Sequence, residues 1–173
     1  MKQLIILSLM ALLLTSCPGD IWDDSMEENR DTKYMPVLME RSQLESSVAV
    51  LEKQDLKKPG KMYFYGRYIF IIEKYKGIHM IDNEDATNPK NLLFIRVPGC
   101  VDVAAKQNYL YVDNATDLVT IDISALPELS VTKRVSNVFP DLLPPDANLM
   151  PEQFNRDNRP ENTVIVEWIE NNK

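Results

Sequence analysis

The fold is decided by YIFIIEKYKGIHMID at residues 68–82 and by YLYVDNATDLVTID at residues 109–122. The first halves of these stretches align at an offset of 41 residues, and the second halves align at an offset of 40. Both halves recur in the same order, so the sequence predicts two consecutive copies of one structural unit. Self-similarity with a period of roughly 40 residues is typical of repeat architectures.

Each copy contains two β-rich runs separated by a polar turn, at residues 73–77 and 113–117. In the second copy, apolar and polar residues alternate with the period of two that indicates a strand. Residues 92–97 and 130–135 are candidate third strands. We therefore expect an all-β fold with propeller-like, four-stranded antiparallel blades, about two of them over residues 62–136.

Six residues occupy repeat positions that we assign a structural role. Asp82 and Asp122 are equivalent, and an aspartate at a strand end accepts backbone N–H bonds in the following turn. An active site does not usually occur twice in one chain, which favours the structural interpretation. The other four repeat positions are Gly77, Pro89, Asp117 and Pro127.

These phrases resemble a known family. The segments GIHMIDNEDATNPKNLLFIRVPG and NYLYVDNATDLVTIDIS are similar to the LVIVD-repeat lipoproteins, which are bacterial surface proteins predicted to form β-propellers. YMPVLMERSQLE, KKPGKMYFYGRYIFI and the later VIVEWIE also resemble that family. The similarity covers about residues 33–136 and implies no particular activity. The chain resembles a shortened member, since a closed propeller needs about four to eight blades.

The N-terminus has the pattern of a secretory signal over residues 1–16. Lys2 is followed by an apolar run from Leu4 to Leu14, which is shorter than the roughly 20 residues that span a bilayer. Leu14-Thr15-Ser16-Cys17 resembles the bacterial lipobox, and the resemblance implies cleavage before Cys17 and attachment of lipid to its sulfur. Two or three acyl chains would then hold the chain on a membrane.

Residues 17–34 form an acidic tether in this interpretation. A run of like charges stays solvated and extended, so the segment would act as a spacer. Its acidic residues directly after Cys17 also resemble the signal that exports some lipoproteins to the outer face of the outer membrane, with the periplasmic face as the alternative location. Asp24-Ser25-Met26 resembles a short O-glycosylation motif with Ser25 as the acceptor.

The regions flanking the repeats are a lead-in at residues 35–61 and a C-terminal part at residues 137–173. Ser42-Gln43-Leu44-Glu45 has the capping-box pattern, which predicts a short helix from about Ser42 to Lys53, ended by Lys58-Pro59-Gly60. In the C-terminal part, a proline-rich loop at 137–160 precedes a strand at Thr163–Ile169. We expect Val164, Val166 and Trp168 on one face of that strand.

The composition excludes several classes of function. The 173 residues include 26 acidic and 19 basic ones, for a net charge of −7, which argues against a nucleic-acid partner. One histidine cannot build a multi-histidine metal site, and phosphate-binding and nucleophile-elbow motifs are absent. An EF-hand loop beginning at Asp82 would need glycine where Thr87 stands. We predict no cofactor, no metal and no catalytic residue.

The two residues that look reactive have ordinary structural interpretations. His79 aligns with Val119 at a strand position that favours a hydrogen-bonded packing role. Cys100 has no basic neighbour in the sequence to activate it, so we expect a buried thiol.

The function expected from the sequence is a non-catalytic, lipid-anchored binding or scaffold module at the cell surface. Its partner would be an unknown protein or glycan, and open sheet edges suggest self-association. Two alternatives remain: a glycan-binding accessory lipoprotein of a nutrient-uptake system, or a truncated, non-functional remnant of a longer propeller. The aromatic candidates for glycan binding are Tyr65, Tyr75 and Trp168.

Overall fold

The computed structural model describes residues 31–126 and 128–171, and these are mostly β-strand. All sheets are antiparallel, so the predicted all-β class is confirmed. The signal segment and most of the tether lie outside the described residues, as do Cys17, Ser25 and Pro127. In chain order the strands and the α-helix are β1 (Tyr34–Glu40), α2 (Arg41–Glu45), β2 (Ala49–Glu52), β3 (Pro59–Tyr65), β4 (Tyr68–Glu73), β5 (Gly77–Asp82), β6 (Lys90–Arg96), β7 (Val103–Lys106), β8 (Tyr109–Asn114), β9 (Asp117–Ala125), β10 (Glu128–Val135) and β11 (Thr163–Glu170).

The internal repeat exists in the backbone as two four-stranded meanders, β3–β6 and β7–β10. Tyr68 pairs with Asp82 in the first, and Tyr109 pairs with Asp122 in the second, so the registers match. The equivalent turns also share a left-handed backbone, at Tyr75 and Ala115. The same is true of the preceding hairpins, where Gly66 and Gln107 have positive φ.

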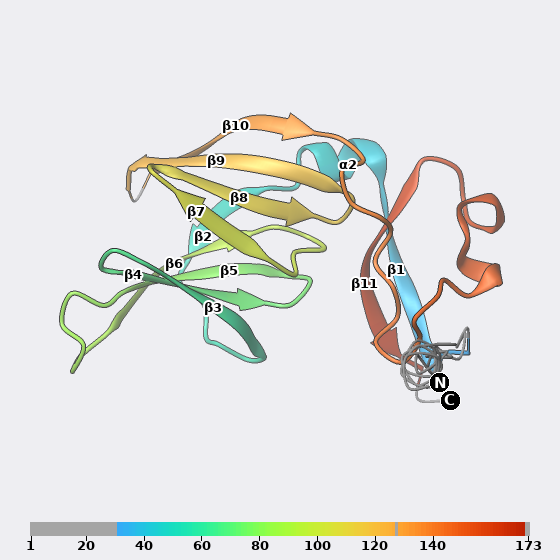
Figure 1. Cartoon of the computed structure of the whole chain (residues 1–173), viewed down its shortest axis with the longest axis horizontal. Coiled ribbons are helices and arrows are strands. Elements are labelled where there is room, and N and C mark those ends of the chain that lie inside the picture. Colours follow the sequence, from blue (N-terminus) through green and yellow to red (C-terminus); the bar gives the residue numbers. More distant parts are fainter. Residues whose placement is uncertain (1–30, 127, 172–173) are drawn as a thin grey trace, which may run out of the picture.

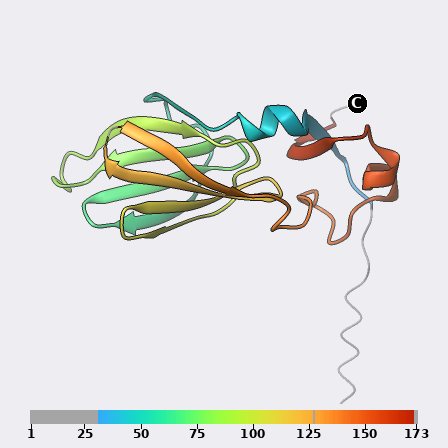
Figure 2. The same cartoon turned by 90° about the horizontal axis from the view of Figure 1, so that it is seen from above.

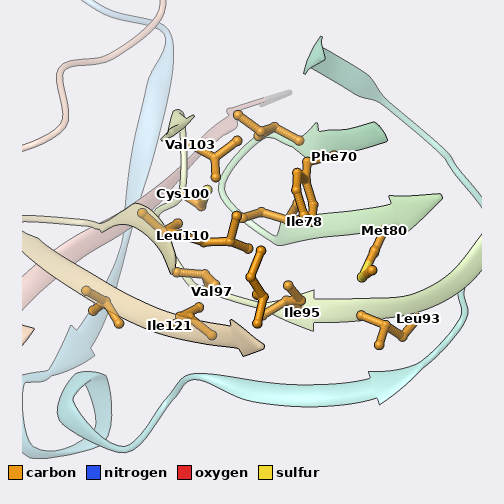
Figure 3. Close-up of a cluster of buried hydrophobic side chains, with 14 residues drawn as sticks. Phe70, Ile78, Met80, Leu93, Ile95, Val97, Cys100, Val103, Leu110 and Ile121 are labelled. Atoms are coloured by element: carbon orange, nitrogen blue, oxygen red, sulfur yellow. The ribbon is translucent and has the colours of Figure 1, made fainter. Parts of the chain in front are cut away.

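The two sheets pack face to face and bury the main hydrophobic core between them (Figures 1 and 3). This arrangement follows from period-two alternation, because each strand turns one apolar side toward the other sheet. Two sheets are present in this sandwich, and the described residues close no propeller. The core residues are Phe70, Ile72, Ile78, Met80, Leu93, Ile95, Val97, Cys100, Val103, Leu110, Val112, Val119, Ile121 and Ile123.

The lead-in helix is shorter than predicted, so the expected helix from about Ser42 to Lys53 is wrong in its length. The helix α2 contains five residues, and Ser42 does not cap it, because the N-cap is Glu40 and makes no side-chain hydrogen bond. Residues 49–52 form strand β2 instead, which pairs with β6 and gives the first sheet a fifth strand. Backbone partners at the open edge of β6 outweigh the weak preference of so short a segment for helix.

Strand β3 corrects a second expectation about the same region. Lys58-Pro59-Gly60 was expected to end the helix, but Pro59 begins β3. Proline is tolerated there because β3 is an edge strand and Pro59 is its first residue. The lead-in at residues 35–61 therefore supplies most of β1, then α2, β2 and the start of β3.

A ribbon of β1 and β11 stands beside the sandwich, with the loop 137–160 folded against it (Figure 2). The loop contains two 3-10 turns, at Glu152–Phe154 and Arg156–Asn158. Apolar side chains cover both faces of the ribbon. One face packs against Leu44 of α2 and Ala115, and the other packs against Tyr75 and the loop.

The faces of β11 differ from the prediction. Val164 and Val166 lie on one face, but Trp168 lies on the other with Ile165. The cause is a register shift, in which Val37 pairs with Glu167 and Leu38 pairs with Ile165. Val166 is thus an extra residue in the strand, and a bulge of this kind reverses the alternation beyond it.

Candidate functional site

A large apolar hollow lies on the outer face of the second sheet. It has a volume of about 650 Å³ and runs between strands β7–β9 and the chain segment 139–143. We name it the β7–β9 groove. Its floor comes from Ala104, Tyr111 and Leu118, and its far wall comes from Phe139 and other residues of the segment. Its lining residues are Val101, Asp102, Val103, Ala104, Tyr111, Asp113, Ala115, Leu118, Phe139, Pro140, Asp141, Leu142 and Leu143.

Strand pairing places the floor residues side by side. Ala104 pairs with Tyr111 across β7 and β8, and Asp113 pairs with Leu118 across β8 and β9. Paired residues share a face of the sheet, and these alternate with Val112 and other core residues on the inner face. The groove is therefore the solvent side of the same strands that build the core.

Hydrogen bonds fix the wall of the groove in place. The backbone N–H of Phe139 donates to the carbonyl of Thr116 at 3.0 Å. The indole N–H of Trp168 donates to the carbonyl of Leu142 at 2.9 Å. Because these bonds tie the segment both to a hairpin turn and to β11, the apolar wall keeps its position beside the sheet. Phe139 and Leu143 remain 37% and 42% exposed.

Asp141 also fixes this segment. Its carboxylate accepts hydrogen bonds from Arg156 at 2.9 Å and from Arg159 at 3.0 Å. Burial by itself would raise the pKa of Asp141, but the two arginines outweigh it and hold the pKa below its usual value. Asp141 is therefore a paired anion that anchors the loop.

Asp113 is the buried carboxylate in the groove lining. It accepts backbone N–H bonds from Val101 at 2.9 Å and from Asp102 at 2.8 Å, which shape the chain between the two sheets. Burial raises the pKa of Asp113, because a charged carboxylate is costly to desolvate and these hydrogen bonds compensate only in part. No basic side chain in the described part of the chain forms an ion pair with it.

Asp117 lies at the other end of the same turn and has the opposite environment. Its fully buried carboxylate binds Arg41 at 2.6 Å and Arg134 at 2.7 Å. Burial alone would raise the pKa of Asp117, but the hydrogen bonds from Arg41 and Arg134 outweigh it and lower the pKa. This cluster joins α2, β9 and β10, so the repeat position Asp117 has a structural role.

The remaining repeat positions have local structural environments. Asp82 accepts the N–H of Glu84 at 3.0 Å, and Asp122 accepts the N–H of Ser124 at 2.8 Å. These are the turn hydrogen bonds expected of an aspartate that ends a strand. Gly77 packs so closely on β6 that a Cβ atom there would lie 2.1 Å from the carbonyl oxygen of Ile95. Pro89 is exposed directly before β6.

His79 and Cys100 are fully buried and are not among the residues that line the groove. The Nε2 atom of His79 lies 3.0 Å from the carboxylate of Glu73, and its ring packs on Phe94. Burial raises the pKa of the Cys100 thiol well above its usual value, so the thiol is protonated at neutral pH. Both residues pack in the interior.

The three aromatic candidates for glycan binding also serve packing. Tyr75 and Trp168 are buried between the sandwich and the ribbon. The hydroxyl of Tyr65 donates to the carbonyl of Gln107. Tyr111 is the aromatic residue of β8 that lines the groove, and no motif in the sequence marks it as a site residue. Its place on the outer face could have been read from the alternation of that strand.

Comparisons with known proteins identify no relative. No family model matches the chain, and no curated protein or solved structure matches it. Among residues 31–126 and 128–171, no group of three or more histidine, cysteine or acidic residues could hold a metal ion. In the same ranges, no helix is long and apolar enough to cross a bilayer.

Proposed function

We propose that this chain is a non-catalytic binding module anchored in the outer membrane through lipid on Cys17, facing the cell surface. The lipobox-like sequence supports the anchor, and the acidic tether supports the location. The resemblance to the LVIVD-repeat lipoproteins agrees with both. The repeats provide a rigid scaffold, and the β7–β9 groove is the binding surface.

The groove is the observation that carries this proposal. A hollow of about 650 Å³ with an apolar lining falls in the size range typical of ligand sites. Its lining residues include no histidine, serine, cysteine or lysine, and two of its three carboxylates are held in ion pairs. The chemistry that the lining offers is apolar contact with a few carboxylates, which suits binding.

Site-specific photo-crosslinking on intact cells tests the binding function. A photoreactive phenylalanine analogue replaces Phe139 on the groove wall, and in a matched variant it replaces Phe64. Phe64 is 65% exposed on β3 of the other sheet, so it is at least as accessible as Phe139. We expect a discrete adduct from position 139 and none from position 64. No adduct at 139, or equal adducts at both positions, would contradict the proposal.

The anchor and the location have separate tests. Cys17→Ala should abolish labelling by a fatty-acid probe, whereas Cys100→Ala should retain it because Cys100 is buried. Labelling of the Cys17→Ala variant would refute the lipid anchor. Protease added to intact cells should digest the chain, and complete protection would place it on the periplasmic face.

A further inference from the structure

All the charged side chains that line the β7–β9 groove are acidic. Its lining contains three carboxylates, on Asp102, Asp113 and Asp141, and no basic residue. Two of these are neutralised from outside the groove. Lys61 binds Asp102 at 2.5 Å, and two arginines bind Asp141. Asp113 alone among the three has no basic partner in the described residues.

An unneutralised carboxylate in an apolar wall is costly, and a cation that reaches it would regain part of that cost. Asp113 is 8% exposed, and its pairing with Leu118 places it on the groove face. A ligand that fills the apolar floor would bring a neighbouring positive charge close to this carboxylate. Hydrogen bonds in which one partner is charged are stronger than those between neutral groups, so the charge would matter for selection.

We propose that the groove binds a segment of a partner protein in which an apolar side chain lies next to a lysine or arginine. This inference rests on the proposed function and specifies its ligand. Exposed apolar side chains at the rim, on Phe139 and Leu143, are typical of the contact residues in protein interfaces. An anionic lipid surface is disfavoured, because the groove carries the same sign of charge.

Asp113 also makes the binding sensitive to pH. The ionisable groups that face it are the thiol of Cys100 and, more distantly, the ammonium of Lys61, and the carboxylate of Asp102 lines the same groove. Cys100 is protonated at neutral pH, and Lys61 is paired with Asp102, so Asp113 is the group whose titration changes the charge of the groove wall. Affinity for a cationic ligand should therefore fall as the pH drops through the pKa of Asp113.

The test uses three acetylated and amidated peptides, Gly-Leu-Phe-X-Leu-Gly, in which X is lysine, glutamine or glutamate. They are titrated into the full-length chain while the methyl groups of Leu118 and Ala104 are followed by NMR, with Met62 on β3 as the control. We expect shifts at the groove and none at Met62. The lysine peptide should bind about tenfold more tightly than the glutamine peptide, and the glutamate peptide should bind weakest.

Each other outcome overturns the inference. Equal affinity of all three peptides would show that charge does not select the ligand, although the groove would still be a binding surface. If octylammonium binds and none of the peptides does, the ligand of the groove is a small cationic amphiphile and not a segment of a protein. No shift at the groove with any probe would refute the ligand class, and the crosslinking at Phe139 would then decide separately whether the binding function stands.

A variant isolates the contribution of Asp113. Asp113→Asn should bring the lysine and glutamine peptides to the same affinity, and Asp122→Asn, which lies outside the groove, should preserve the tenfold difference. If Asp113→Asn fails to fold, the pH dependence of the native chain gives the same information. Lysine-peptide affinity should fall in acid while glutamine-peptide affinity stays constant. If the affinities of the lysine and glutamine peptides fall in parallel as the pH drops, the role of Asp113 is refuted.

Discussion

The two equivalent turns of the repeat, at residues 73–77 and 113–117, have the same backbone and different chemistry. Tyr75 and Ala115 are both buried residues in the left-handed region of φ, where non-glycine residues are uncommon. The first turn ends in Gly77, which approaches the backbone of β6 closely. The second turn ends in Asp117, which binds two arginines.

The difference shows how one ribbon is attached to a repetitive scaffold. Tyr75 packs on the face of β11 that carries Ile165, and Ala115 packs on the opposite face with Val164. The two turns therefore contact the ribbon from both sides. A repeated backbone supplies two anchoring points, and the residues at those points determine which face each one contacts.

The largest effect is expected from Asp117→Asn. This change leaves Arg41 and Arg134 without their shared carboxylate, and breaking a buried ion pair costs about 3–5 kcal/mol. Urea denaturation should show this loss in the free energy of unfolding. Asp122→Asn is the matched control, because its exposed carboxylate binds only a turn, and it should change stability by much less. Equal losses in the two variants would contradict the role of the cluster.

Gly77→Ala should break the first turn. Its φ of 151° is unfavourable for alanine, and the new Cβ would meet the carbonyl oxygen of Ile95 at 2.1 Å. Because backbone must move, we expect a loss of about 3 kcal/mol, measured as a lower midpoint of urea unfolding. Gly66→Ala is the control. It also has positive φ, but nothing lies within 4 Å of its Cβ position. A loss no greater than that of the control would rule out the close contact.

The pH dependence of stability should separate Asp113 from Asp117. The pKa of Asp117 is lowered on folding, so its stabilisation is complete above the unfolded value of about 3.9 and is lost as the pH falls through the folded pKa. The pKa of Asp113 is raised, so its contribution becomes less favourable as the pH rises from about 3.9 through the folded pKa.

Melting temperatures measured between pH 3 and pH 7 check this contrast. The melting temperature of Asp117→Asn should fall furthest below that of the native chain at neutral pH and least in acid. The melting temperature of Asp113→Asn should rise relative to that of the native chain as the pH rises. The same trend in both variants would show that the two carboxylates do not differ as the structure indicates.

Ala115→Gly should have the smallest effect. Glycine relieves the cost of a φ of 56°, but it removes a buried methyl group from the contact with Val164 and Val166. These changes oppose each other, so we expect stability within about 1 kcal/mol of the native chain. Tyr75→Gly at the equivalent position should lose more, since it removes an entire buried aromatic side chain.

The edges of the sheets bear on the predicted self-association, which stays a prediction. At one rim of the sandwich, β3 of the first sheet is joined to β7 of the second. The hydroxyl of Tyr63 donates a hydrogen bond to the carbonyl of Ala105 at 3.2 Å. On the other rim, β2 has only four residues, and β10 contains two register shifts and carries Lys133. Short strands, bulges and lysines are features that oppose edge pairing in natural sheets.

The candidate site was less predictable than the strands. Alternation could have placed Tyr111 and Leu118 on the outer face of β8 and β9, but nothing local indicated that Phe139 would face them across the groove. Asp113 stood at the start of a polar turn, where a solvated carboxylate is the ordinary expectation. Its burial depends on Val101 and Asp102, whose N–H groups bond to it after a close approach of the two sheets.

The amino-acid sequence by itself determined the repeat, the positions of most strands and the hydrogen-bonded turns after Asp82 and Asp122. These are properties of short segments, and alternation and turn residues encode them locally. Only the tertiary structure decided that residues 49–52 pair with β6, that Val166 bulges and that the β7–β9 groove exists. Each of these depends on partners distant in the chain, whose hydrogen bonds and burial outweigh local preferences.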